Sequence, residues 1–203
     1  MTISALTDAL SLSREAQNLL FREARTANTF SSEPVSDEQI RAIHELIKWA
    51  PTSMNTQPLR VVLLRSEDAR QRLIPHLGEG NRPKTEGAPL IAILAADIEF
   101  HEHLPRTFPH YPGAKDGFAD RDRRVHVARL NALLQVGYFI LGVRAAGLAV
   151  GPMSGFDSAG VDREFFADGT RQSLVVANIG KPGENPWFER NPRLDYDDVV
   201  STL

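Results

Sequence analysis

An uninterrupted apolar segment at 89–96 (PLIAILAA) restricts the possible folds more than any other part of the chain. Polar and apolar residues do not alternate in it, which is typical of a strand that is covered on both faces. A second segment, 123–146, is apolar on nearly all sides after Leu130 and predicts a buried, central helix. Because helices and strands follow one another without strict alternation, we expect an α+β protein with helices on both faces of a small sheet.

Capping residues and hydrophobic spacing predict further elements. Ser36 and Gln39 form a capping box, so a helix is expected from there to Ala50, where Pro51 ends it. The remaining predictions are strands at 61–64 and 172–179, helices after Ser66 and Asp157, a connection at 78–89, a long excursion at 97–124, a turn at 151–155 and an extended tail from 180.

Length, charge and cysteine content exclude several classes of protein. The chain of 203 residues is expected to form a single domain, 1–203, because no linker or repeat divides it. It contains no cysteine, which excludes disulfides, thiolate nucleophiles and cysteine-ligated metals. The net charge is only −3 and basic residues are scattered, so neither nucleic acid nor a membrane surface is an expected partner.

The same sequence predicts a cytoplasmic location. The N-terminus lacks the charged-then-apolar arrangement of a signal peptide. The longest apolar stretch, 130–148, contains Asn131, Gln135 and Arg144, which favours a core helix over a membrane span.

Motifs for hydrolysis and for nucleotide binding through a glycine-rich loop are absent from the sequence. His101 and His103 could bind a metal, but in a polar, proline-rich segment a solvated stretch is the better interpretation, and no metal site is expected. Three loops remain, each with small and polar residues: 24–28 (ARTAN), 51–58 (PTSMNTQP) and 151–155 (GPMSG). With nearby isolated cations, they suggest a nucleotide or a flavin.

These loops resemble, in order, the motifs of the flavin-dependent nitroreductase family. The matching segments are 25–30 (RTANTF) with R-[ST]-x-[RK]-x-F, 50–58 with A-P-S-x-x-N-x-Q-P, 81–84 (NRPK) with N-x-x-K, 152–157 (PMSGFD) with P-x-x-G-F, and Arg193 with the arginine of the tail. The resemblance covers about 20–203. It implies a three-layer α/β/α sandwich with a mixed, mainly antiparallel sheet, in an intertwined homodimer whose tails, 180–203, embrace the partner subunit.

The resemblance also implies one FMN in each groove between subunits. Arg25 and Arg193 would hold its phosphate with help from Thr26, and a backbone amide at Ser154 or Gly155 would meet flavin N5. The other implied contacts are Asn28, Asn81 and Lys84 at the pyrimidine edge or ribityl chain, Pro152 and Met153 in the same loop as Ser154, and Pro51, Thr52, Ser53 and Asn55 from the second subunit. No catalytic side chain is assigned.

Within the family, the motifs are most similar to the malonic semialdehyde reductases of pyrimidine degradation. This implies that NADPH or NADH reduces FMN and that a small aldehyde, malonic semialdehyde, becomes 3-hydroxypropanoate. Asn28 replaces a cation found in most relatives, and Ser154 replaces a common acidic residue. The alternatives are a nitroaromatic or quinone reductase with the same flavin, or a flavin-binding module without catalysis.

Overall fold

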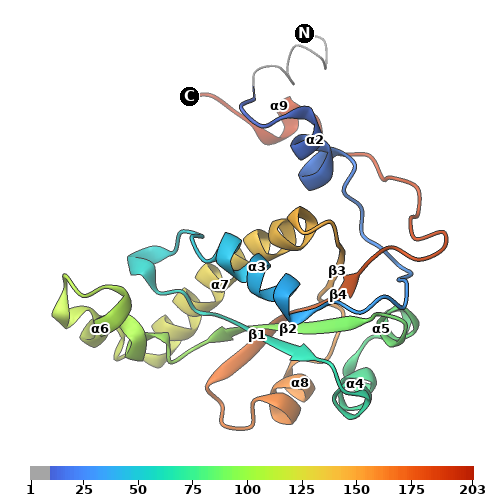
Figure 1. The fold of residues 1–203 in the computed structure, drawn as a ribbon. Helices are drawn as coiled ribbons and strands as arrows, with labels where there is room; N and C mark the ends of the chain where they lie inside the picture. Colours follow the sequence, from blue (N-terminus) through green and yellow to red (C-terminus); the bar gives the residue numbers. More distant parts are fainter. Residues whose placement is uncertain (1–9) are drawn as a thin grey trace.

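The computed structural model describes residues 10–203, which form four strands and the helices around them (Figure 1). The strands are β1 (Leu59–Leu64), β2 (Leu90–Asp97), β3 (Ala149–Met153) and β4 (Arg171–Gly180). They pair in the order β1-β2-β4-β3, and all three pairings are antiparallel. The expected α+β fold with a mainly antiparallel sheet is confirmed, and the described residues contain no parallel pair.

Helices cover both faces of this sheet (Figure 1). The helices are α2 (Arg14–Gln17), α3 (Asp37–Ile47), α4 (Glu67–Leu73), α5 (Arg82–Glu86), α6 (Leu104–Thr107), α7 (Arg121–Ala145), α8 (Ser158–Phe165) and α9 (Tyr196–Val199). Shorter turns are a π-helix at Asn18–Arg22 and 3-10 helices at Ser53–Asn55, Ile74–His76, Glu79–Asn81, Phe100–His103 and Pro112–Phe118. Figure 1 shows α3 and α7 on one face and α4 and α8 on the other, which gives three layers.

Strand β2 explains why the layers form. All eight of its residues are buried. Leu90, Ala92 and Leu94 belong to the core under α3 and α7, whereas Ile91 and Ile93 belong to the core on the opposite face. Since successive side chains of a strand point to opposite faces, an apolar run without alternation supplies both cores at once.

Local capping sets where the helices begin. Ser36 Oγ accepts from the Gln39 N–H at 3.2 Å, and Gln39 Oε1 accepts from the Ser36 N–H at 2.9 Å. Ser66 and Asp157 cap α4 and α8 in the expected way. Helix α3 ends at Ile47, so the predicted end at Ala50 is three residues too late.

Two predictions about connections are wrong. The glycine- and proline-rich connection at 78–89 contains α5, because Pro83 lies in the first turn of that helix, where its missing N–H costs nothing. The predicted turn at 151–155 begins inside strand β3, which ends at Met153. Pro152 is tolerated there because β3 is at the edge of the sheet.

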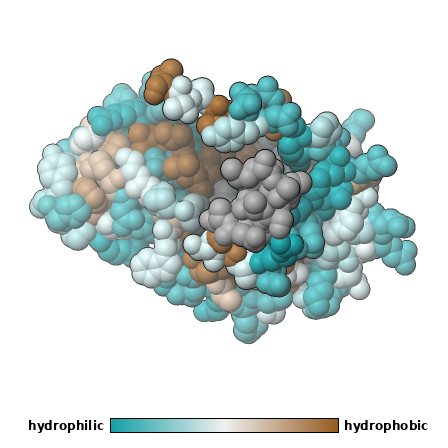
Figure 2. All heavy atoms as spheres, turned by 90° about the horizontal axis from the view of Figure 1, so that it is seen from above, coloured by the Kyte–Doolittle hydropathy of each residue, from teal (hydrophilic) through white to brown (hydrophobic). Residues whose placement is uncertain are grey.

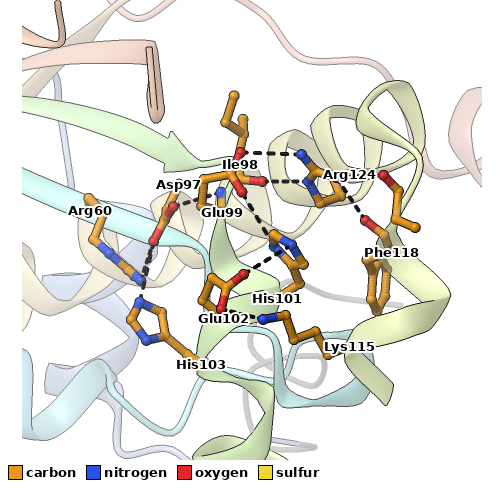
Figure 3. Close-up of polar contacts among 11 residues, drawn as sticks. Arg60, Asp97, Ile98, Glu99, His101, Glu102, His103, Lys115, Phe118 and Arg124 are labelled. Carbon is orange, nitrogen blue, oxygen red and sulfur yellow. Dashed lines mark hydrogen bonds and ion pairs between the residues drawn. The ribbon is translucent and has the colours of Figure 1, made fainter. Parts of the chain in front are cut away.

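The excursion at 97–124 is part helix and part loop, and polar contacts anchor both of its ends (Figure 3). Asp97 accepts from Arg60 Nη2 at 2.5 Å and from the Glu99 N–H at 2.9 Å. At the other end, the guanidinium of Arg124 donates to three backbone carbonyls, those of Ile98, Phe118 and Ala119, at 2.8–3.3 Å.

Helix α7 is buried on one face only, so the expectation of a helix buried nearly all round is wrong. Its buried residues, among them Val136 and Val143, pack on the sheet. Four large apolar side chains on the rest of its surface are 42–55% exposed: Leu130, Leu133, Leu134 and Tyr138. By length and composition α7 could cross a membrane, but core helices pass the same test, and α7 lies across the sheet here. Figure 2 shows apolar residues gathered on the side seen from above.

The contact between α3 and α7 requires a glycine. A Cβ on Gly142 would lie 2.4 Å from Ile47 Cγ2 and 3.1 Å from Ile43 Cγ2, and both isoleucines have few rotamers in a helix. Replacing Gly142 with alanine is therefore expected to lower the free energy of unfolding by about 1–2 kcal/mol in urea titration. Gly117→Ala is the control, because its Cβ would also meet nothing within 4 Å and it is exposed in the excursion at 97–124, outside α7. That variant should change the free energy of unfolding by less than about 0.5 kcal/mol. Equal effects of the two substitutions would contradict this account of the contact.

Candidate functional site

The first part of the tail lies along an N-terminal segment of the same chain. The N–H of Asn28 donates to the Pro186 carbonyl, the N–H of Ser31 to the Lys181 carbonyl, and the N–H of Gly183 to the Thr29 carbonyl, each at 3.0 Å. Figure 1 shows the two segments running together away from the sheet. Two of the predicted site segments, which are far apart in sequence, are thus joined by backbone hydrogen bonds.

Between these segments is a hollow of about 270 Å³ with a strong positive charge. Of the predicted site residues, Arg25, Thr26, Asn28 and Arg193 line it. The other lining residues are Ala24, Arg144, Phe188, Glu189, Arg190 and Asn191. Four arginines and a single glutamate therefore line the hollow. Three of these arginines also donate to backbone carbonyls, Arg25 to Phe188, Arg190 to Ala24 and Arg193 to Asn191 and Pro192, which leaves further N–H donors of each guanidinium for a phosphate.

Arg144, near the C-terminal end of α7, is a site residue that sequence reasoning missed. Its Nη1 donates to the Leu20 carbonyl at 3.0 Å, and its buried Nε has no partner among the described residues. Burial lowers the pKa of the Arg144 guanidinium, although an arginine remains charged. A half-buried cation without a carboxylate is costly unless an anion approaches it. Its one signal in the sequence is a charge inside the otherwise uncharged stretch 130–148.

A second group of predicted residues meets at the end of β3. The Gly155 carbonyl accepts from Asn81 Nδ2 at 3.0 Å and from the Gly78 N–H at 2.9 Å. A Cβ on Gly78 would lie 3.0 Å from that carbonyl oxygen, so any larger residue there would have to displace the carbonyl by a few tenths of an ångström. Ser154 is exposed beside it.

The other predicted residues of this group lie around the same point. The Thr85 hydroxyl donates to the Asn81 carbonyl at 2.8 Å and lies 3.9 Å from Met153 Sδ. Pro152 precedes Met153 in β3. Lys84 is half-buried and makes no ion pair with any described residue.

Strand β3 connects the two groups. A Cβ on Gly151 would lie 3.2 Å from the Ala27 carbonyl oxygen, so the segment 24–28 passes directly over this strand. The predicted residues from 24–28, from 81–84, from 152–155 and from the tail therefore surround one end of the sheet.

The loop 51–58 is not part of this arrangement within one chain. Figure 1 shows it on the opposite side of the molecule from the tail. The Ser53 N–H donates to Asn131 Oδ1, and Asn55 Nδ2 donates to the Thr107 carbonyl, each at 2.7 Å. Pro51, Thr52, Ser53 and Asn55 could join the other predicted residues only from a second copy of the chain.

The histidines of the excursion form no metal site in the part of the chain that the structure describes. His101 is buried between two carboxylates, with Nδ1 3.7 Å from Glu99 and Nε2 3.5 Å from Glu102 (Figure 3). His103 Nε2 lies 3.6 Å from Asp97. The contacts of these histidines hold the excursion together.

Comparisons with known proteins agree on one family. Residues 21–181 match the Nitroreductase family. A protein of Streptomyces griseus, provisionally named an NADH dehydrogenase/NAD(P)H nitroreductase, is 59% identical over 196 residues, which are 96% of this chain and 100% of that protein.

Solved structures show the same fold. A crystal structure from Bacillus subtilis, provisionally named a nitroreductase, aligns with a TM-score of 0.81 and 21% identity over 93% of this chain and 99% of that one. Another, from Exiguobacterium sibiricum and solved in complex with FMN, aligns with a TM-score of 0.79 and 16% identity over 95% of this chain and 99% of that one.

Proposed function

Since this chain belongs to the nitroreductase family, we propose that it is an oxidoreductase that binds FMN and uses NADPH or NADH as the reductant. The observation that carries the proposal is the hollow between 24–28 and the tail, where four arginines meet one carboxylate. The names of the 59% identical relative and of the FMN complex from Exiguobacterium sibiricum support the same reductant and the same cofactor. We also propose that the protein is cytoplasmic, as expected from the sequence.

The residues present fit an FMN phosphate. Arg25, Arg144 and Arg193 would hold it, because guanidinium groups donate in pairs to phosphate oxygens. The unpartnered Nε of Arg144 is the observation that best fits a missing anion. Thr26 would add a hydroxyl donor from the same segment.

The rest of the flavin would lie towards the end of β3. Asn28, Asn81 and Lys84 would meet polar atoms of the ring or the ribityl chain, and an amide at Ser154 or Gly155 would meet N5. Pro152 and Met153 would support that loop from β3. When bound, FMN supplies the hydride chemistry, and the chain binds it, orients it and excludes water. No side chain is assigned as a general acid.

A homodimer completes the proposed site. Pro51, Thr52, Ser53 and Asn55 would come from the second subunit. The exposed apolar face of α7 supplies a surface for association, because large apolar patches on a folded chain mark interaction sites. The tail is bonded to its own chain as far as Arg190 and lines the hollow as far as Arg193, so the part that embraces the partner would be 194–203.

For the substrate, we propose malonic semialdehyde, which would be reduced to 3-hydroxypropanoate. The support is the set of motifs shared with that branch, in particular 151–157 (GPMSGFD), where Ser154 stands at the position of a common acidic residue. A nitroaromatic or quinone reductase is the second candidate, because the 59% identical relative carries a nitroreductase name.

Reduction and reoxidation of the bound flavin separate these candidates. We expect the purified protein to be yellow, to bleach with NADPH without oxygen, and to recover its absorbance on addition of malonic semialdehyde. The kcat/KM for the aldehyde is expected to exceed that for a nitroaromatic compound by about tenfold or more.

Each other outcome decides against part of the proposal. Recovery with nitroaromatics or quinones only would favour the second candidate. Bound flavin that NADPH and NADH both fail to bleach would indicate a flavin-binding module. A protein that stays colourless after incubation with FMN would contradict the proposed cofactor.

A further inference from the structure

Asn131 is a buried polar residue in the middle of an apolar helix. It is 3% exposed, and the neighbouring turns of α7 carry Ala128, Ala132 and Leu134. Its Oδ1 accepts from the Ser53 N–H at 2.7 Å, and its Nδ2 donates to the Val127 carbonyl at 2.9 Å. Both ends of the carboxamide are therefore used, and the acceptor is directed at the loop 51–58.

A second polar residue of α7 holds the other end of the same loop. Gln135 follows Asn131 by four residues, so the two lie on one side of the helix. Gln135 Oε1 accepts from the Leu59 N–H at 2.9 Å. Helix α7 thus contacts the loop at Ser53, where its 3-10 turn begins, and at Leu59, where β1 begins.

Between these two contacts the backbone is strained. Met54, Asn55 and Gln57 have φ values of 49°, 51° and 43°, a region that residues other than glycine rarely adopt. Such conformations persist only where the surroundings impose them.

Residues of the loop 51–58 also form hydrogen bonds with one another. Thr52 Oγ1 accepts from the Gln57 N–H at 3.1 Å, and Gln57 Nε2 donates to Asn55 Oδ1 at 2.9 Å. These bonds stiffen the loop but do not place it on the helix. The Asn55 contact with Thr107 is exposed, whereas the bond from Ser53 to Asn131 is partly buried and ties the loop to α7.

We propose that Asn131 is a positioning residue, which orients Ser53 and thereby the face of the loop that meets the flavin of the partner subunit. This inference rests on the proposed function, in which 51–55 completes the second subunit's site. Asn131 does not itself touch the flavin. Ser53 is exposed, so its side chain is accessible to the ligand while its N–H is bound to Asn131.

The test compares Asn131→Leu with Val136→Ala in the full-length protein. Asn131→Leu removes the acceptor, and Val136→Ala destabilises the same helix at a buried site facing the sheet core. We expect FMN dissociation constants about tenfold higher in Asn131→Leu, equivalent to about 1.4 kcal/mol, together with a shifted flavin midpoint potential. The amides of 52–57 should exchange faster with solvent. Val136→Ala should lower thermal stability and leave the FMN affinity and the potential unchanged.

A conservative variant separates positioning from packing. Asn131→Asp keeps an oxygen facing the Ser53 N–H, and its protonated form can also donate to the Val127 carbonyl as Nδ2 does. It is therefore expected to retain FMN affinity within about twofold at a pH low enough to protonate this carboxyl. The proposal is overturned if Asn131→Leu matches Val136→Ala in affinity and potential, or if protonated Asn131→Asp binds FMN as weakly as Asn131→Leu.

The design also separates this inference from the proposed function. Should Asn131→Leu fail to fold, Asn131→Ala removes the same acceptor without adding a bulky side chain, and the same expectations and the same contradicting result apply to it. A wild-type protein that binds no flavin would contradict the proposed function. In that case, amide exchange at 52–57 would still show whether Asn131 holds the loop.

Discussion

Replacing Arg25 with alanine is expected to weaken FMN binding about 100-fold and to leave riboflavin binding unchanged. Arg25 lines the positively charged hollow, and charge-assisted hydrogen bonds to a phosphate are each worth about 1.5–3 kcal/mol. Riboflavin has the same ring and ribityl chain but no phosphate. The ratio of the two dissociation constants, measured by quenching of flavin fluorescence, therefore isolates the contribution of the phosphate.

The control is Arg121→Ala, which removes an exposed positive charge at the opposite end of α7 from Arg144. It changes the net charge of the protein equally and should leave both dissociation constants as they are. If Arg25→Ala weakens the binding of FMN and of riboflavin by the same factor, then Arg25 stabilises the fold of the site and does not bind the phosphate.

Replacing Leu134 with glutamate is expected to convert a dimer into monomers at micromolar concentration. Leu134 is 52% exposed on the apolar face of α7. In an interface with two-fold symmetry each substitution occurs twice, so two charges would be buried without partners, at several kcal/mol in total. Light scattering after size-exclusion chromatography gives the mass, and the monomer should lose FMN because 51–58 no longer reaches the site.

Ala167→Glu is the matched control. Ala167 is exposed in the connection between α8 and β4, away from α7. It adds the same charge to each chain and should leave the mass and the flavin content unchanged. A dimeric Leu134→Glu protein with full flavin content would show that this face of α7 is not the interface.

The core of the fold could be predicted from sequence because it depends on local signals. The apolar run of β2 and the capping residues Ser36, Ser66 and Asp157 are each decided within a few residues. Strand β3 was harder to predict, because its glycine and proline favour a turn. The strand is possible only because β3 lies at the edge of the sheet, where a proline is tolerated.

The candidate site was predicted only where motifs are contiguous. Arg25, Asn81 and Gly155 stand in recognisable segments, and the structure brings these segments to one end of the sheet. Arg144 and Asn131 were not found, because their partners lie in other elements and depend on how α7 crosses the sheet. The exposed face of α7 could not be predicted from the sequence either. When a helix has apolar residues on all sides, the pattern does not show which side the rest of the chain covers.

The pairing of 24–31 with 181–190 has a consequence for how the protein is made. Arg25 leaves the ribosome long before Arg193, yet both line the same hollow. The sheet and its helices can assemble while the chain is still growing, but the hollow has no second wall until the tail has been synthesised. A phosphate-bearing ligand can therefore be held there only after the segment around Arg193 has joined the segment around Arg25.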